Sequence, residues 1–427
     1  MKIHSSTGLH GCVTVPGDKS VSHRSVMLGA LADGVTHVTG FLMGEDCLST
    51  IDCFRKMGVA IEVGVDHDVT VHGVGLHGLR EPSERLYTGN SGTTTRLISG
   101  ILAGQAFPVS LTGDASIEKR PMGRVITPLR QMGADITGVD DKFCPLSIRP
   151  SRLHGIEYTL PVASAQLKSA ILLAGLYADG PTTVIEPAPS RDHTERMLRQ
   201  LGCRVETEGC RITVYPPEKL TASDVAVPAD ISSAAFFLVA GAIVPNSEVT
   251  IRSVGVNPTR DGVIEVLQNM GADITLSNRR DDGEPVCDVT VRSSRLHGVE
   301  IGGALIPRLI DELPVLAVAA AFAEGETIIR DAAELKVKES NRILAMVTEM
   351  TRAGADVTET ADGMIIRGGK PLRGASFETY NDHRIAMSMA VCALACAGES
   401  EIQNDAVVAI SYPDFFDTLR QLGGEPV

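Results

Sequence analysis

The feature that most constrains the fold of this chain is an internal repeat of about 70 residues. One marker is a helical run that ends at a glycine before a strand, and it recurs at Gly58, Gly133, Gly202, Gly271, Gly354 and Gly423. A second marker is an apolar helical run that ends at a turn residue before a short β-branched strand, and it recurs at Gly34, Gly104, Gly180, Asn246, Gly325 and Gly398. Such residues are expected where a helix ends in a left-handed conformation. Two independent markers therefore predict six copies of one unit.

Each unit is predicted to run strand, helix, strand, helix and then two strands. The sixth unit stops soon after Gly423, so its final part is missing at that end of the chain. Residues 1–11 end in Leu-His-Gly, and the same tripeptide follows the final strand of other units at residues 76–78, 153–155 and 296–298. We therefore expect the N-terminal segment to complete the sixth unit and to make the repeat a closed one.

Six units divide into two domains of three units each, and a chain of 427 residues is long enough for two or three domains. The N-terminal segment belongs with the sixth unit, so one domain is expected to be discontinuous, with residues 1–17 plus 226–427. The other domain, residues 18–225, is inserted into it. The two crossings of the chain, near residues 16–20 and 222–228, are the expected hinge.

The charge balance limits the partners of the chain. Its 39 Lys and Arg against 53 Asp and Glu leave a net charge of −14, which disfavours nucleic acid and anionic membranes. No apolar run is long enough for a transmembrane helix, and the N-terminus resembles neither a signal nor a transit peptide. We therefore expect a cytoplasmic protein in which any anionic ligand is held by a local group of cations.

The first helix of every unit is predicted to begin at a polar cluster. These clusters are Gly17–Arg24, Gly89–Arg96, Ala163–Ser169, Asp230–Ala234, Arg308–Leu313 and Asn381–Arg384. Helix capping alone explains any single cluster. Six clusters in equivalent places, accompanied by Lys and Arg, instead favour a shared site where free N–H groups and guanidinium forks bind a small ligand with several negative charges.

Two acidic residues stand out among these cations. Asp311 lies at an apolar helix start, where it is either an N-cap or a proton-transfer group that works with Glu339. Lys338 and Arg342 are four residues apart, and such like charges repel each other unless an anion lies between them or solvent screens them.

The sequence contains no P-loop, zinc-binding spacing or GxSxG motif, so neither a metal ion nor a cofactor is expected.

The clusters carry motifs that resemble those of the EPSP synthase (3-phosphoshikimate 1-carboxyvinyltransferase) family, in its class II-like bacterial form, over essentially the whole chain. The motifs are PGDKSVSHR, GNSGTTTR, GDASIEKRPM, ASAQLKSA, RDHTERML, LIDELP, VKESNR and YNDHRIAM. The resemblance implies an α/β fold of two hinged domains, each of three βαβαββ units, in the inside-out α/β barrel arrangement of enolpyruvyltransferases. It also implies a transferase of the shikimate pathway that needs no cofactor, and a monomer is expected. The reaction is transfer of the carboxyvinyl group of phosphoenolpyruvate to the 5-hydroxyl of shikimate 3-phosphate by addition and elimination.

Residue roles follow from the same resemblance. Shikimate 3-phosphate would be bound by Lys19, Ser20, Arg24, Ser164, Ala165, Gln166, Ser190, Arg191, Asp311 and Lys338. Phosphoenolpyruvate would be bound by Lys19, Asn90, Gly92, Arg120, Gln166, Arg342 and Arg384. The catalytic residues would be Asp311, Glu339 and Lys19, and the sequence leaves open which of the two acids moves which proton.

Three positions depart from the family pattern. Ala165 stands where many relatives have a second Ser, Asn341 replaces the more usual Asp, and Ile410 stands where some relatives place a Lys.

Three other functions compete with this interpretation. The sister enolpyruvyltransferase that acts on UDP-N-acetylglucosamine shares the six units, but it typically carries a Cys at the position of Ala115. An RNA-end cyclase on a related fold would need a basic surface. A non-catalytic repeat scaffold would not need Asp311 and Glu339 among cations.

Overall fold

The computed structural model describes residues 1–281 and 283–426, which form six four-stranded sheets. The chain divides into two compact units. We call Gly17–Val227 the inserted unit, and Met1–Pro16 with Pro228–Val427 the discontinuous unit. Residues 282 and 427, which belong to the expected discontinuous domain, lie outside the described residues. Each unit has one hydrophobic core of its own.

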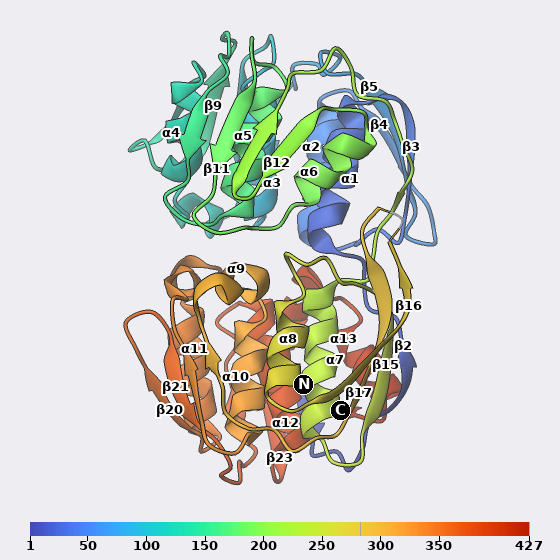
Figure 1. Ribbon diagram of the computed structural model, residues 1–427, viewed down its shortest axis with the longest axis vertical. Helices are drawn as coiled ribbons and strands as arrows, with labels where there is room; N and C mark the ends of the chain where they lie inside the picture. The colour runs from blue at the N-terminus through green and yellow to red at the C-terminus, as the bar shows by residue number, and fades with distance from the viewer. Residues whose placement is uncertain (282, 427) are drawn as a thin grey trace. The chain divides into compact units, whose positions relative to one another are not determined.

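The inserted unit contains three sheets and six α-helices (Figure 1). The strand orders are β14 (Val225–Ala226), β3 (Asp33–Thr39), β5 (Val69–Val74), β4 (Ala60–Val63); β6 (Leu86–Tyr87), β7 (Val109–Thr112), β9 (Phe143–Arg149), β8 (Asp135–Val139); and β10 (Glu157–Thr159), β11 (Thr182–Ile185), β13 (Arg211–Val214), β12 (Val205–Glu208). The helices are α1 (Lys19–Leu31), α2 (Glu45–Lys56), α3 (Gly92–Leu102), α4 (Gly123–Gln131), α5 (Ala165–Gly175) and α6 (His193–Gln200).

The discontinuous unit repeats this plan. Its strand orders are β16 (Asp273–Arg280), β17 (Val286–Arg292), β15 (Glu248–Gly255), β2 (His10–Val13); β18 (Glu300–Ile301), β19 (Glu326–Ile329), β21 (Met364–Arg367), β20 (Asp356–Glu359); and β22 (Ser376–Phe377), β23 (Glu399–Ile402), β1 (Lys2–His4), β24 (Glu425–Pro426). Its helices are α7 (Ile231–Ile243), α8 (Gly262–Asn269), α9 (Ile306–Leu309), α10 (Leu313–Phe322), α11 (Arg342–Arg352), α12 (His383–Ala395) and α13 (Phe415–Gln421).

Helices fill the centre of each unit and the sheets lie outside them (Figure 1). Helices α7, α10 and α12 are buried on nearly all sides, as are α1, α3 and α5 in the inserted unit. Their sequences explain this, because a helix such as LPVLAVAAAF in α10 is apolar all round and must be covered on every face. The predicted fold class is confirmed, because each compact unit contains three repeat units with the helices inside and the sheets outside. Over the described residues, the four-stranded sheets are open and do not close into barrels.

The repeat markers are borne out at all but two positions. Gly58, Gly133, Gly202, Gly271, Gly354 and Gly423 all end a helix with φ between 86 and 96°. In the second series the positive φ is found at Gly34, Asn246, Gly325 and Gly398. Gly104 and Gly180 do not adopt it, so the left-handed turn predicted there is wrong. Before Gly104, the C-cap of helix α3 is Ala103, whose backbone is still in the right-handed helical conformation.

The N-terminal strand completes the sixth sheet, as the sequence predicts. Strand β1 pairs antiparallel with β23 and β24, the position that β21 takes in the fifth sheet. The structure adds an exchange that the sequence did not reveal. Strand β2 precedes α1 but pairs with β15 of the fourth sheet, whereas β14 precedes α7 but pairs with β3 of the first sheet. Both crossings of the chain therefore fall between a strand and the helix that follows it.

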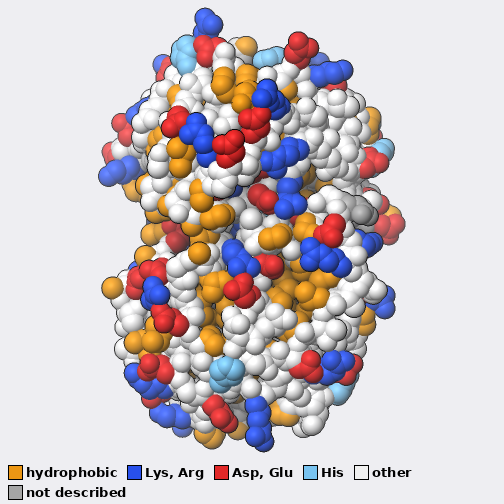
Figure 2. All heavy atoms as spheres, in the orientation of Figure 1, with side chains coloured by type: hydrophobic (Ala, Val, Ile, Leu, Met, Phe, Trp, Pro, Cys, Tyr) orange, Lys and Arg blue, Asp and Glu red, His pale blue; other side chains and the backbone are white. Residues whose placement is uncertain are grey.

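Charged side chains of both signs are mixed over the face of the molecule drawn in Figure 2. Among the described residues, no helix has the length and apolar character that crossing a bilayer requires.

Candidate functional site

Each unit contains its own group of predicted site residues and neighbouring charged residues, most of them near the starts of its central helices. The inserted-unit cluster comprises Lys19, Ser20, Arg24, Asn90, Gly92, Arg96, Arg120, Ser164, Ala165, Gln166, Ser190 and Arg191. The discontinuous-unit cluster comprises Asp311, Glu312, Lys338, Glu339, Arg342, Asp382 and Arg384.

Side-chain caps fix the helix starts of the inserted unit. The Val21 N–H donates to the Asp18 carboxylate at 2.9 Å, and the Thr94 N–H donates to the Ser91 hydroxyl at 3.1 Å. Ser164 caps α5 by accepting from the Leu167 N–H at 3.4 Å. A hydroxyl that accepts here still has its own proton to donate. Capping and ligand binding are therefore compatible roles for Ser164, and Ala165 follows it as the first residue of α5.

Arg24 is buried, and three of its contacts are hydrogen bonds to oxygen atoms. Its Nε donates to Thr194 Oγ1 at 2.6 Å, and its terminal nitrogens donate to the Ser20 carbonyl and to Ser169 Oγ, both at 2.9 Å. All three acceptors are neutral. The guanidinium fork is thus locked in one orientation, which is the arrangement that favours bidentate recognition of phosphate.

Two guanidinium groups converge beside Gly92. A Cβ atom at position 92 would lie 2.9 Å from Arg96 Nη1 and 3.0 Å from Arg120 Nη1. Only a residue without a side chain leaves both groups in place. Arg96 also donates to Gln166 Oε1 at 2.6 Å, and the Gln166 amide donates to Thr93 Oγ1 at 3.0 Å.

Arg96 and Asp46 are site residues that the sequence interpretation missed. Arg96 could have been found, because it lies four residues after Gly92 on α3 and therefore faces the same side of the helix. Asp46, near the start of α2, forms an ion pair with Lys19. Nothing in the spacing of the motifs pointed to this acid.

Ser190 and Arg191 lie in the loop that joins β11 to α6. The Ser190 hydroxyl donates to the Glu186 carboxylate, and the Ser190 carbonyl accepts from the Lys168 amine at 3.2 Å. Ser190 is buried, whereas Arg191 is partly exposed. Glu186 and Lys168 therefore anchor this loop at Ser190.

In the discontinuous-unit cluster, Asp311 bridges two cations. Its Oδ1 lies 3.5 Å from Lys338 Nζ and 3.3 Å from Arg342 Nη1. This carboxylate is the anion that the like-charged pair Lys338 and Arg342 requires. Both cations thereby hold the Asp311 carboxylate in one place, as acid–base chemistry requires of a positioned carboxyl group.

Arg342 is only 1% exposed and is surrounded by carboxylates. It donates to Asp382 through Nε at 2.8 Å and to Glu339 through Nη2 at 2.6 Å, in addition to its contact with Asp311. Burial alone would lower the pKa of this guanidinium, but Asp382, Glu339 and Asp311 together raise it above its ordinary value. Burial likewise favours a raised pKa for Asp382, yet Arg342 holds it below the ordinary value of an aspartic acid.

Arg384 contacts Asp311 and its neighbour Glu312. Its Nη1 donates to the Asp311 carbonyl at 3.2 Å and lies 3.9 Å from the Glu312 carboxylate. Asp382 caps α12 by accepting from the Arg384 N–H at 2.9 Å. Asn341 caps α11 in the same manner, accepting from Leu344 N–H at 3.2 Å, so this departure from the family pattern preserves a helix start. Ile410 lies in the short 3-10 helix Asp405–Ile410.

His23 lies buried beneath the inserted-unit cluster. Its Nδ1 is 2.7 Å from Thr50 Oγ1, which is itself 2.7 Å from Thr94 Oγ1. Burial and the neighbouring Lys19 and Arg24 hold the pKa of His23 well below its ordinary value, although Asp18 acts in the opposite direction. The imidazole therefore adds no positive charge to the cluster near neutral pH.

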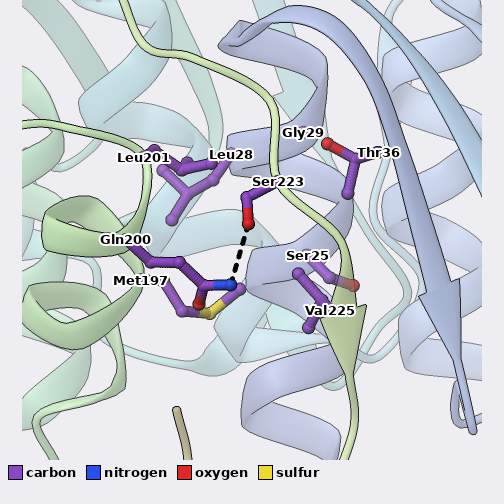
Figure 3. Close-up of a pocket in the computed structure, with 9 residues that line it drawn as sticks. All are labelled: Ser25, Leu28, Gly29, Thr36, Met197, Gln200, Leu201, Ser223 and Val225. Carbon is purple, nitrogen blue, oxygen red and sulfur yellow. Dashed lines mark hydrogen bonds between the residues drawn. The ribbon is translucent and has the colours of Figure 1, made fainter. Parts of the chain in front are cut away.

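A small cavity of the inserted unit contains none of the predicted site residues (Figure 3). It is lined by Ser25, Leu28, Gly29, Thr36, Met197, Gln200, Leu201, Ser223 and Val225. The Gln200 amide donates to Ser223 Oγ at 3.0 Å across it and also to the Asp224 carbonyl at 3.0 Å. These bonds fasten the segment that leads to β14 onto α6. Among the described residues, no group of three or more His, Cys, Asp and Glu side chains has the geometry to hold a metal ion.

Comparison with known proteins adds support of a different kind. The family model for EPSP synthase (3-phosphoshikimate 1-carboxyvinyltransferase) matches residues 3–419. A 3-phosphoshikimate 1-carboxyvinyltransferase of Geobacillus kaustophilus is 58% identical over 420 residues, and one of Thermoanaerobacter sp. (strain X514) is 56% identical over 415; each match covers 97% of this chain and 98% of the relative. A solved structure of EPSP synthase from Acinetobacter baumannii is 49% identical, with a TM-score of 0.89 over 99% of this chain and 97% of that one.

Proposed function

The chain belongs to the EPSP synthase (3-phosphoshikimate 1-carboxyvinyltransferase) family, and from this we propose a division of labour between its two clusters. The reaction is the transfer of the carboxyvinyl group of phosphoenolpyruvate to the 5-hydroxyl of shikimate 3-phosphate, with release of phosphate, in the shikimate pathway of aromatic amino acid and chorismate biosynthesis. The relatives do not favour the alternative enzyme that acts on UDP-N-acetylglucosamine. What we propose concerns which residues carry out this reaction.

The inserted-unit cluster holds most of the anionic charge of the substrates in our proposal. Lys19, Ser20, Arg24, Ser164, Ala165, Gln166, Ser190 and Arg191 bind shikimate 3-phosphate, with Asp311 and Lys338 of the other unit. The support is the locked guanidinium of Arg24 and the free proton of the Ser164 hydroxyl. Both supply donors to a phosphate, which is purely an acceptor at neutral pH.

Phosphoenolpyruvate is bound by Lys19, Asn90, Gly92, Arg120, Gln166, Arg342 and Arg384. The observation that carries the proposal is the convergence of the Arg96 and Arg120 guanidinium groups on Gly92, where a bare backbone lets an anion approach closely.

The discontinuous-unit cluster moves the protons. Glu339 gives a proton to the methylene carbon of phosphoenolpyruvate, which leaves the adjacent carbon electron-poor. The 5-hydroxyl oxygen attacks that carbon and passes its proton to Asp311. In the second step Glu339 takes back a proton from the new methyl group as the carbon–oxygen bond to phosphate breaks, which restores the double bond. The proton held by Asp311 passes to the leaving phosphate, which returns Asp311 to its starting form. Lys19, Arg342 and the other cations stabilise the charge that develops in both steps.

We further propose that the enzyme is a cytoplasmic monomer that needs neither metal ion nor cofactor, because Arg, Lys and helix N-termini meet the phosphate charges. The two chain crossings, Pro16–Gly17 and Val227–Pro228, are proposed as a hinge between two domains. Shikimate 3-phosphate should then protect these crossings from proteolysis, and identical digestion with and without the ligand would contradict the hinge.

One assay tests the proposed reaction. The protein is mixed with shikimate 3-phosphate and phosphoenolpyruvate in the presence of EDTA, and free phosphate is followed. We expect release that depends on both substrates. No release, together with release when UDP-N-acetylglucosamine replaces shikimate 3-phosphate, would overturn the assignment.

A further inference from the structure

Lys168 is a buried cation that the proposed reaction does not use. It lies on α5, is 1% exposed, and forms ion pairs with Glu186 at 2.9 Å and with Glu195 at 2.7 Å. Both carboxylates are also almost completely buried. Burial lowers the pKa of an amine, but Glu195 and Glu186 more than offset that effect, so the pKa of Lys168 is raised and the lysine stays charged. We call these three residues the Lys168 triad.

The triad joins three elements of the third repeat unit. Lys168 comes from α5, Glu186 follows the end of β11, and Glu195 lies in the first turn of α6. A buried ion pair is costly to desolvate and gives little net stability compared with apolar packing. Stability alone therefore does not explain why Lys168 is buried together with two carboxylates.

Only one of the two carboxylates reaches the loop that carries Ser190 and Arg191. Glu186 accepts from the Ser190 hydroxyl and, at 3.4 Å, from the Ser190 N–H. Lys168 donates to the Ser190 carbonyl at 3.2 Å. The hydroxyl, the N–H and the carbonyl of Ser190 are thus all bonded to Glu186 or Lys168. Glu195 is bonded to Lys168 instead.

We propose that the Lys168 triad is a positioning device that fixes the Ser190–Arg191 loop for binding of shikimate 3-phosphate. The inference rests on the proposed function, because it takes these two loop residues as part of that binding site. Glu186 sets the conformation of Ser190 and Lys168 fixes its carbonyl, whereas Glu195 is bonded to Lys168 and acts on its packing alone. None of the three touches substrate, so they act through Ser190.

The asymmetry of the triad provides a matched pair of variants. Glu186→Gln and Glu195→Gln each remove one carboxylate charge from the same lysine and leave the other ion pair. Only Glu186→Gln weakens the hold on Ser190. We expect Glu186→Gln to raise KM for shikimate 3-phosphate about tenfold, the usual effect of one disturbed charged hydrogen bond, with kcat and KM for phosphoenolpyruvate within about twofold. Glu195→Gln should leave all three constants within about twofold, although both variants lower Tm.

Equal KM values for shikimate 3-phosphate in the two variants, at either the wild-type or a raised level, would overturn the proposal, because the triad would then be merely structural. Should Glu186→Gln fail to fold, Glu186→Asp keeps the charge but withdraws it from Ser190, and the same comparison with Glu195→Asp applies. Arg191→Gln reports separately on the proposed function. A normal KM for shikimate 3-phosphate in Arg191→Gln would remove the loop from the binding site, whereas a raised KM there with a normal one in Glu186→Gln would reject the triad alone.

Discussion

The two units are built from the same repeat, yet they hold their cations in different ways. In the inserted unit, Arg24 and Arg96 donate to hydroxyl, carbonyl and amide oxygens. In the discontinuous unit, Arg342 donates to three carboxylates. Within the inserted-unit cluster, Lys19 is an exception, because it is paired with the Asp46 carboxylate.

This difference suggests different chemical tasks. A guanidinium oriented by neutral oxygens presents its positive charge to a phosphate or carboxylate ligand. A guanidinium held by acids instead keeps those acids close together, which suits proton transfer by positioned carboxyl groups. Helix starts at equivalent positions of the repeat thus serve anion binding in the inserted unit and acid–base chemistry in the discontinuous unit.

The largest expected effect comes from removing the acid of the discontinuous unit. Asp311→Asn keeps the shape of the side chain but abolishes its capacity to accept a proton, so kcat should fall about 10²–10⁴-fold. Both KM values should stay within about threefold, as measured by steady-state phosphate release. Asp356→Asn, at a surface ion pair with Lys370 in the same unit, is the control and should remain active. Activity of Asp311→Asn within about tenfold of wild type would break the comparison.

A smaller effect is expected in the inserted unit. Arg24→Lys retains the charge but loses the fork that donates to Thr194 and Ser169, so KM for shikimate 3-phosphate should rise roughly 10–100-fold, with kcat nearly unchanged. Arg130→Lys alters an exposed arginine paired with Asp141 and serves as the matched control. If kcat fell instead of the affinity, Arg24 would belong with the chemical machinery and the contrast between the units would fail.

Gly92→Ala sharpens the comparison further. The new Cβ would press against Arg96 and Arg120, so the two guanidinium groups must move apart. We expect KM for phosphoenolpyruvate to rise about tenfold, equivalent to one charged hydrogen bond, while KM for shikimate 3-phosphate stays within about twofold. Gly180→Ala, where the Cβ meets no atom within 4 Å, controls for the substitution itself. An unchanged KM for phosphoenolpyruvate would place that substrate elsewhere.

The smallest effect concerns stability. The unfolded chain protonates His23 near pH 6.5, but the folded state resists protonation until a much lower pH. The stability that neutral His23 contributes is therefore lost as the pH falls below about 6.5, by about 1 kcal/mol between pH 6.5 and 5.5. Urea unfolding at these two pH values should show a smaller loss for His23→Gln than for wild type. His72→Gln, at an exposed histidine, should behave like wild type, and an unchanged loss in His23→Gln would show that this histidine is protonated in the folded state.

The repeat made most of the fold predictable. Glycines such as Gly58 and Gly271 mark helix ends with a conformation that other residues rarely adopt, so their spacing is a direct record of the architecture. The exchange of β2 and β14 left no such record. Both strands are short and pair through backbone groups, which carry no sequence signal about the partner strand.

The site was predictable wherever function fixes a residue type at a helix start. The like charges of Lys338 and Arg342 pointed to an anion beside them, and the structure shows that Asp311 is such an anion. The sequence did not predict the roles of Asp46 or the Lys168 triad, because the paired residues are separated in the sequence and meet only through packing. Whether Ser190 and Arg191 contact substrate stays a prediction.

The pairing of β1 has a consequence for how the protein is made. Ile3 lies opposite Pro426, so its sheet is completed only once residue 426 has been made. The inserted unit has its own core and its closing strand β14 well before that point, and domains generally fold as units in the order of their synthesis. On the ribosome, the first sixteen residues must therefore wait, with their backbone donors unpaired, while the inserted unit folds behind them. Resistance of the nascent chain to protease should accordingly arrive in two stages, the middle of the chain first and its two ends together.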